Sequence, residues 1–316
     1  MNKHRYIRFF HWILIICAYS YIIYQLAVFD DYAALRKQFT GAHTWQHLSL
    51  LVCFALFPLN IWLEARKWQC LMRGVEPMSM REAQRQVYFG IVGGFVTPYR
   101  VGDYPARVLL LREKEHRLSG ITMALAGSVS LTTVIVLAGL PSLCFFFAGD
   151  TLRPLWTVFF AAFLCVLFLA LLPWLIRLLA RIDWRKPKLK ELLQQLASMH
   201  YATLLHVLWL SFLRYVCFSL QMALALCFCG ADMSISDMFI ALPLYYLLVT
   251  LTPNLPAADL GIRGGWAVFV FSHWGCTAPA AAMATGCMWL INTLAPLLLA
   301  TLITHPRKTS YPPSAP

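Results

Sequence analysis

Long apolar runs alternate with short basic segments along the whole chain. The runs lie at 8–29, 47–63, 119–148, 154–176, 204–229 and 277–303. A helix rises about 1.5 Å per residue, so about 20 residues cross the roughly 30 Å hydrocarbon core of a bilayer. The run from 47 needs its flanking residues to do so. This pattern predicts an all-α polytopic membrane protein with about six full transmembrane helices, the first of them an uncleaved anchor.

Two other apolar stretches are interrupted by similar polar residues about half a chain apart. The first contains Thr97-Pro98-Tyr99-Arg100-Val101-Gly102-Asp103, and the second contains Thr252-Pro253 followed by Asp259-Leu260-Gly261-Ile262-Arg263. Helix breaks and charges are costly at membrane depth, because no water is there to satisfy freed backbone groups or to solvate an ion. They persist mainly where protein surrounds a cavity. Two such breaks in one chain therefore predict a transporter-like site.

Composition supports the membrane class and narrows the chemistry. The chain is 60% hydrophobic and only 13% charged, which leaves too little polar surface to cover a soluble globule. Its ten cysteines form no C-x-x-C pair, and its nine histidines show no metal-ligand spacing. We find no nucleotide-binding glycine loop and no nucleophile elbow. The sequence thus predicts no metal and no cofactor, and no motif in it indicates an enzyme.

The positive charge is distributed unevenly. The net charge is +12, and basic residues gather at 3–8, 66–85, 112–117, 177–190 and 307–308. The positive-inside rule puts all of these segments, Lys67 included, in the cytoplasm, together with both chain termini. Cytoplasmic bases of this kind contact anionic lipid headgroups, so nucleic acid need not be invoked as a partner.

The charge map also predicts the path of residues 86–111. A single crossing would put Arg81 and Arg85 on the opposite side from the 112–117 cluster, whereas a re-entrant hairpin keeps both clusters in the cytoplasm. Each half of the segment, Gln86–Phe95 and Asp103–Leu111, would reach about 15 Å, near the bilayer midplane. The second interrupted segment, 237–273, contains no Lys or Arg except Arg263, and we expect it to enter from the outer face.

These elements predict two repeats within a single integral membrane domain, 1–316. The first repeat covers 8–148 with its hairpin at 86–111, and the second covers 154–303 with its hairpin at 237–273. Each repeat would cross the bilayer three times, so the second is expected to be inverted relative to the first. The two Thr-Pro pairs are 155 residues apart. Inverted repeats with broken helices meeting at the midplane are a recurring transporter plan.

The sequences of the two interrupted segments also resemble those of a known protein family. Thr97-Pro98-x-Arg100-Val101-Gly102-Asp103-x-x-x-Arg107, with the later Asp259-Leu260-Gly261-Ile262-Arg263-Gly264, resembles the paired signatures of the lysylphosphatidylglycerol synthase transmembrane region family, also described as flippase-like domains. The likeness extends over nearly the whole chain. Members fused to a soluble aminoacyl-transferase domain make and translocate aminoacylated phosphatidylglycerol. Only a Pro-rich tail, 304–316, follows the last apolar run. We therefore expect the lipid-handling part without the synthase part, in a bacterial inner (plasma) membrane.

The two breaks suggest a phosphate site. Arginine binds phosphate through two N–H groups at once, and we expect Arg100 and Arg263 to do so from facing breaks. Gly102 permits a tight reversal, and Asp103 is expected to cap a half-helix whose free N–H groups attract anions. The charges of Asp103 and Asp259 would compete with an anion. They are expected instead to orient the arginines or to take up a proton or cation. The predicted substrate-binding residues are Arg100, Gly102, Asp103, Arg107, Arg214, Asp259, Gly261 and Arg263.

Several of these residues have a purely structural alternative. Arg107 lies four residues after Asp103, and such a pair stabilises a helix without any ligand. Arg214 either lines a cavity or pairs with Glu64. Asn60 and Glu64 are expected to extend towards the headgroups at the end of their span. The glycine pairs Gly93-Gly94 and Gly264-Gly265 are expected to allow close helix approach.

The function that this sequence favours is transbilayer movement of an anionic lipid or a polyprenyl phosphate. Two alternatives stay open. A membrane-embedded transferase acting on a lipid phosphate would need a base or a metal, for which Asp103, Asp259 and Glu64 are the only intramembrane carboxylates. A non-transporting scaffold would need no polar midplane, and the doubled charged break argues against it.

Overall fold

The computed structural model describes residues 44–97, 100–148, 199–252 and 258–303, with a few isolated residues elsewhere. In these ranges every regular element is a helix. The long ones are α3 (Thr44–Met72), α6 (His116–Ala148), α9 (Tyr201–Phe228) and α12 (Ala278–Trp289), the last continuing through η4 (Leu290–Leu294) into α13 (Ala295–Ile303). These four rods are each long and apolar enough to cross a membrane, so the all-α membrane class is confirmed. The runs predicted at 8–29 and 154–176 and the tail 304–316 lie outside the described residues, apart from isolated positions.

The interrupted segments fold as two helical hairpins. The first hairpin consists of α4 (Met80–Phe95) and α5 (Asp103–Val108), and the second of α10 (Ile235–Leu251) and α11 (Asp259–Ser272). Both begin with the same capping box. Ser79 and Glu82 bond each other's backbone N–H at the start of α4, and Ser234 and Asp237 do so at the start of α10. Each box satisfies two otherwise free N–H groups and fixes where the helix begins.

The chain reverses direction within each hairpin. In the first, Gly93 lies against the carbonyl of Gly102 and the methyl group of Ala106. In the second, the indole of Trp266 donates to Thr252 Oγ1 at 2.8 Å, and the rings of Tyr245 and Phe271 lie 5.3 Å apart. The first break is held by Thr97, whose hydroxyl donates to the carbonyl of Gly93 and accepts from Gly102 N.

Two details of the first hairpin correct the sequence prediction. Asp103 is not an N-cap: Gly102 occupies that position with no side-chain capping bond, and the Asp103 carboxylate bonds Arg107 instead. The second half also ends at Val108 rather than Leu111, which leaves α5 only six residues long. A helix this short has only a small macrodipole, so the positive charge at the break has to come from side chains.

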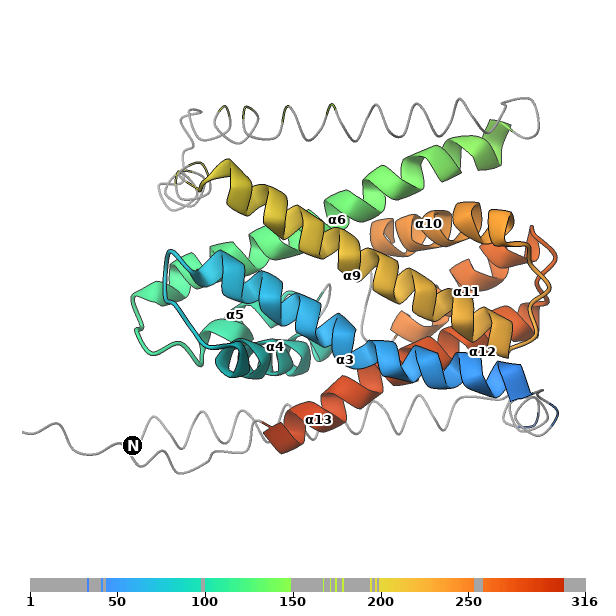
Figure 1. Cartoon of the computed structure of the whole chain (residues 1–316), viewed down its shortest axis with the longest axis horizontal. Coiled ribbons are helices and arrows are strands. Elements are labelled where there is room, and N and C mark those ends of the chain that lie inside the picture. Colours follow the sequence, from blue (N-terminus) through green and yellow to red (C-terminus); the bar gives the residue numbers. More distant parts are fainter. Residues whose placement is uncertain are drawn as a thin grey trace, which may run out of the picture.

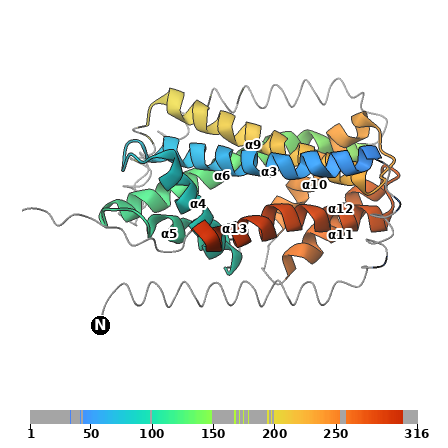
Figure 2. The same cartoon turned by 60° about the horizontal axis from the view of Figure 1, so that its bottom comes forward.

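The helices α3 and α9 pack against each other in opposite directions along most of their length. The side chain of Gln46, near the start of α3, bonds the carbonyl of Phe228 at the end of α9. Further along, Cys53 and Gln221 exchange hydrogen bonds with each other's backbone carbonyls. The first hairpin lies beside the C-terminal half of α3, and the second lies towards its N-terminal end (Figures 1 and 2).

The last helix of each half packs on the hairpin of the other half. α6 contacts α10, and α13 contacts α4. These contacts surround two apolar clusters of buried residues, one around the first hairpin and one around the second. Polar side chains meet between them, close to the two breaks.

Candidate functional site

A cavity of about 370 Å³ opens between the two hairpins and the long helices. Three arginines line it: Arg100 from the first break, Arg214 from α9 and Arg263 from α11. The other lining side chains are amides, hydroxyls, aromatic rings and aliphatic groups, and none of the lining residues is Asp or Glu. Three of the predicted substrate-binding residues thus come together from separate parts of the chain.

Arg100 has an unusual backbone. Its φ angle is 56°, in the left-handed region that non-glycine residues rarely adopt, and it is the only non-glycine residue with positive φ in the described part of the chain. Such conformations cost about 1–3 kcal/mol and persist where the surrounding structure enforces them. The Arg100 side chain is exposed on the cavity and makes no hydrogen bond or ion pair with any other described residue.

Arg263 faces the same cavity but has an anionic partner. Its Nε donates to Asp259 Oδ1 at 2.7 Å, one helical turn earlier, and its side chain is 29% exposed. Asp259 therefore holds this guanidinium, as the spacing suggested. The neighbouring Gly261 has no described atom close enough to contact an added Cβ.

Arg107 is turned away from the cavity. It forms two bonds with Asp103, from Nε at 2.6 Å and from Nη2 at 2.9 Å, and a third with Glu64 Oε1 at 2.8 Å. Its guanidinium also lies over the ring of Trp68, whose indole N–H donates to Gln86. All of these partners are protein groups, so the structural alternative for Arg107 is the one that the geometry supports.

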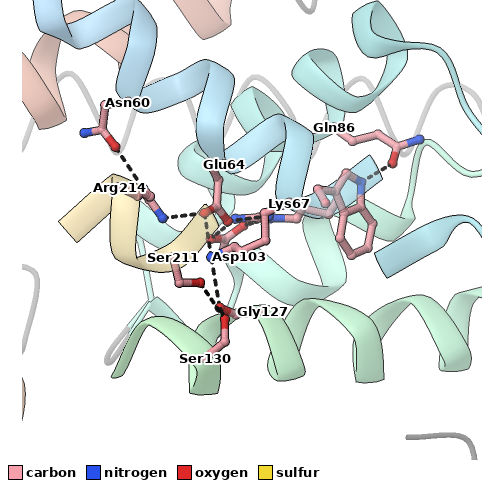
Figure 3. Close-up of polar contacts among 11 residues, drawn as sticks. Asn60, Glu64, Lys67, Gln86, Asp103, Gly127, Ser130, Ser211 and Arg214 are labelled. Carbon is pink, nitrogen blue, oxygen red and sulfur yellow. Dashed lines mark hydrogen bonds and ion pairs between the residues drawn. The ribbon is translucent and has the colours of Figure 1, made fainter. Parts of the chain in front are cut away.

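Glu64 is the centre of a buried charge cluster (Figure 3). We use this name for Glu64, Lys67, Asp103, Arg107 and Arg214. Glu64 Oε2 accepts from Lys67 Nζ at 2.9 Å and from Arg214 Nη1, while Oε1 accepts from Arg107. Lys67 also donates to the carbonyl of Gly127 on α6 at 2.9 Å. The cluster therefore ties α3, α5, α6 and α9 together.

Two sequence predictions are wrong at this cluster. Glu64 and Asn60 do not extend to the headgroups: they are only 5% and 6% exposed and face the protein interior. Lys67, assigned to the cytoplasmic basic segments, is 2% exposed and lies inside the fold. The spacing of Asn60, Glu64 and Lys67 on one face of a helix was the available signal. It did not show that an arginine from α5 would complete the cluster.

Arg214 belongs to both the charge cluster and the cavity. Its Nη1 is bound to Glu64, and its Nε donates to Asn60 Oδ1 at 2.9 Å. Asn60 in turn donates to Asn292 in η4 at 2.9 Å. The Arg214 side chain is 23% exposed, and both alternatives considered for it, cavity lining and pairing with Glu64, are present together.

The chain was compared with protein families, curated proteins and solved structures. No individual curated protein and no solved structure matches it. The family model of the lysylphosphatidylglycerol synthase TM region matches residues 13–300, which is the whole chain apart from its ends. This match shows that the chain belongs to the lysylphosphatidylglycerol synthase TM region family, a membrane domain linked to lipid modification or translocation.

Proposed function

We propose that this protein moves an anionic lipid or lipid-linked phosphate across the bilayer, with the headgroup bound in the arginine-lined cavity. The observation that carries the proposal is the composition of the cavity wall, in which the described residues include three arginines and no carboxylate. A guanidinium offers a planar pair of N–H donors that fits two phosphate oxygens at once. Family membership supports a phosphate that is part of a lipid.

The arrangement of the hairpins supports movement rather than simple binding. The equivalent helices α3 and α9 run in opposite directions, and the two hairpins begin near opposite ends of α3. This is the arrangement expected if the halves are inverted repeats and the hairpins are re-entrant, one from each side. Transporters of this plan bind their substrate where the broken helices meet and open alternately to the two faces.

The test is movement of a fluorescent anionic lipid in proteoliposomes. The double variant Arg100→Ala with Arg263→Ala should lower the initial rate by about tenfold or more, because both arginines contact the headgroup. The double lysine variant should be impaired nearly as much, because lysine keeps the charge but loses the planar donor pair. Arg85→Ala, an exposed arginine on α4 outside the cavity, is the matched control and should move lipid at the normal rate.

Folded yield is measured for every variant in parallel. Normal movement by both double variants would remove Arg100 and Arg263 from the mechanism. Absence of lipid movement by the folded wild-type protein in liposomes of several anionic compositions would overturn the transport function itself.

A further inference from the structure

The charges around the cavity do not balance. Within the described residues, the cavity arginines and the charge cluster contain five cations: Arg100, Arg214, Arg263, Lys67 and Arg107. They contain three anions: Glu64, Asp103 and Asp259. With Lys67 counted as an ammonium, these described groups carry an excess of two positive charges. In a chain surrounded by lipid, excess charge of this kind is costly unless a ligand neutralises it.

The distribution of the ion pairs shows where this excess can be neutralised. Arg263 is compensated by Asp259, and Arg107 is enclosed by Asp103 and Glu64. Lys67 is buried against Glu64 and Gly127. Two cations with incomplete compensation then remain at the cavity wall: Arg100, which pairs with no described carboxylate, and Arg214, which shares Glu64 with Lys67 and Arg107.

Arg214 is also oriented to contribute a donor. Asn60 and Glu64 hold its Nε and Nη1, and its Nη2 makes no hydrogen bond within the described ranges. An anion in the cavity would therefore receive a donor from Arg214 without breaking the charge cluster. Both excess charges reach the same ligand, one through Arg100 and one through Arg214.

We infer that the cavity selects a doubly charged phosphate, that is, a terminal phosphate monoester rather than a phosphodiester headgroup. This inference rests on the proposed function and names the substrate class of the same site. A phosphate monoester carries a charge of about −1.5 to −2 at neutral pH, because its second pKa is about 6. A phosphodiester carries one negative charge and would leave one of the two cationic charges uncompensated in the cavity.

The experiment compares two lipids that differ by one methyl group and one charge. Phosphatidic acid is a monoester, and phosphatidylmethanol is the diester made by methylating the same phosphate. Their binding to the purified full chain in detergent is measured by competition against a fluorescent phosphatidic acid. We expect phosphatidic acid to bind about tenfold more tightly or better, as one more charge pair of this kind predicts.

A charge-removing variant tests whether the preference comes from the cavity. Arg100→Gln lowers the excess from two charges to one, so it should reduce the preference for the monoester to about twofold or less. Arg85→Gln on the exposed surface of α4 should keep the full preference for the monoester.

Glycerol 3-phosphate, a monoester without acyl tails, tests whether the bound phosphate belongs to a lipid or to a soluble molecule. Strong competition by glycerol 3-phosphate would mean that the dianionic ligand of the cavity is a soluble phosphate. Weak competition would mean that the dianionic ligand is a lipid.

Equal binding of phosphatidic acid and phosphatidylmethanol by the wild-type chain would overturn the inference. So would an unchanged preference in Arg100→Gln. Neither result would affect the proposed function, which requires only that anionic lipid is moved in liposomes. Conversely, selective binding without movement would sink the transport proposal and leave the dianion preference intact.

Discussion

The same pair of residues, an aspartate and an arginine four positions later, occurs twice in this chain with different surroundings. Asp103–Arg107 is enclosed by Glu64 and Trp68, whereas Asp259–Arg263 lies beside the cavity. The local ion pair is thus repeated, and the third partner decides what each arginine does. An arginine held by two carboxylates has a structural role, and one held by a single carboxylate keeps donors for a ligand.

This difference predicts opposite effects of one substitution at the two sites. Arg107→Gln should destabilise the fold by about 3–5 kcal/mol, because it takes the ion pair from Asp103 and one of three cations from the buried Glu64. Arg263→Gln should keep most of the stability and lose lipid movement, because it removes the ion pair of a single carboxylate, Asp259, and leaves the charge cluster intact. The measurements are thermal unfolding in detergent and transport in liposomes. Similar unfolding temperatures for the two variants would contradict this assignment.

Sequence reasoning identified the cavity arginines but not the cluster that supports one of them. Arg100 and Arg263 stand out because each interrupts an apolar segment. Glu64 and Lys67 lie near the end of a long helix, where a charged side chain can equally well extend to the headgroups. Only the packing of α5 and α9 against that end distinguishes the two cases, and this packing depends on contacts between residues about 40 and 150 positions apart.

At the scale of elements, the two hairpins begin alike and are built differently inside. In the first, Gly93 lies so close to α5 that an added Cβ would be 2.6 Å from the carbonyl oxygen of Gly102. In the second, Gly264 and Gly265 have no described atom within contact distance. The predicted close helix approach is therefore present at the glycine pair of the first hairpin, and no described helix comes close to the pair of the second. The sequence does not distinguish the two glycine pairs, because both lie next to a charged break.

Alanine substitutions should expose this difference. Gly93→Ala should cost about 1–3 kcal/mol, since the methyl group meets backbone that cannot move aside without opening the hairpin. Gly264→Ala should be neutral or stabilising by up to about 1 kcal/mol, because alanine favours the helix and its methyl group meets no described atom. Thermal unfolding of both variants in the same detergent checks the pair. A loss of stability in Gly264→Ala that matches the loss in Gly93→Ala would refute the difference in packing.

The last long helix contains an element that the sequence did not predict. Between Leu290 and Leu294 it widens into a π-helical turn, η4, and this turn supplies Asn292 to the cavity. Such turns are common at functional sites and carry little sequence signal, because the apolar pattern around them is that of an ordinary helix. Here the turn places an amide opposite Asn60 of α3.

At the scale of the whole molecule, the described helices of the two halves of the chain are joined by contacts that cross between the halves. The apolar runs and the two breaks predicted the class of protein and the hairpin segments. They did not predict that α3 would pack on α9 or that each half's last helix would cover the other half's hairpin. Lipid-facing and buried faces of such helices are both apolar, so hydrophobicity alone does not indicate which helices are neighbours.

The proposed inverted repeat makes a prediction about accessibility from the two sides of the membrane. Single cysteines replacing Arg85 and Arg117, in a cysteine-free background, should react with an impermeant maleimide only from the cytoplasm. A cysteine replacing Ser236, at the start of α10, should react only from outside, because the second hairpin begins at the other end of α3. Labelling of Arg85 and Arg117 positions from opposite faces would exclude re-entry of the first hairpin. Labelling of all three positions from one face would exclude the inversion.

The long antiparallel contact between α3 and α9 has a consequence for how such a molecule can move. Polar contacts join these two helices from one end to beyond the middle of α3, from Gln46 and Phe228 through Cys53 and Gln221 to Glu64 and Arg214. Breaking them would expose unpaired charges and amides to lipid, so the two helices are expected to stay together as a rigid spine. The first hairpin is tied to this spine by the buried ion pair between Arg107 and Glu64. Among the described residues, the second hairpin contacts the spine through apolar packing and a hydrogen bond from Tyr246 to the Phe218 carbonyl. The second hairpin is therefore expected to shift more easily, so that a substrate would pass a stationary Arg214 while Arg263 moves with the hairpin that carries it.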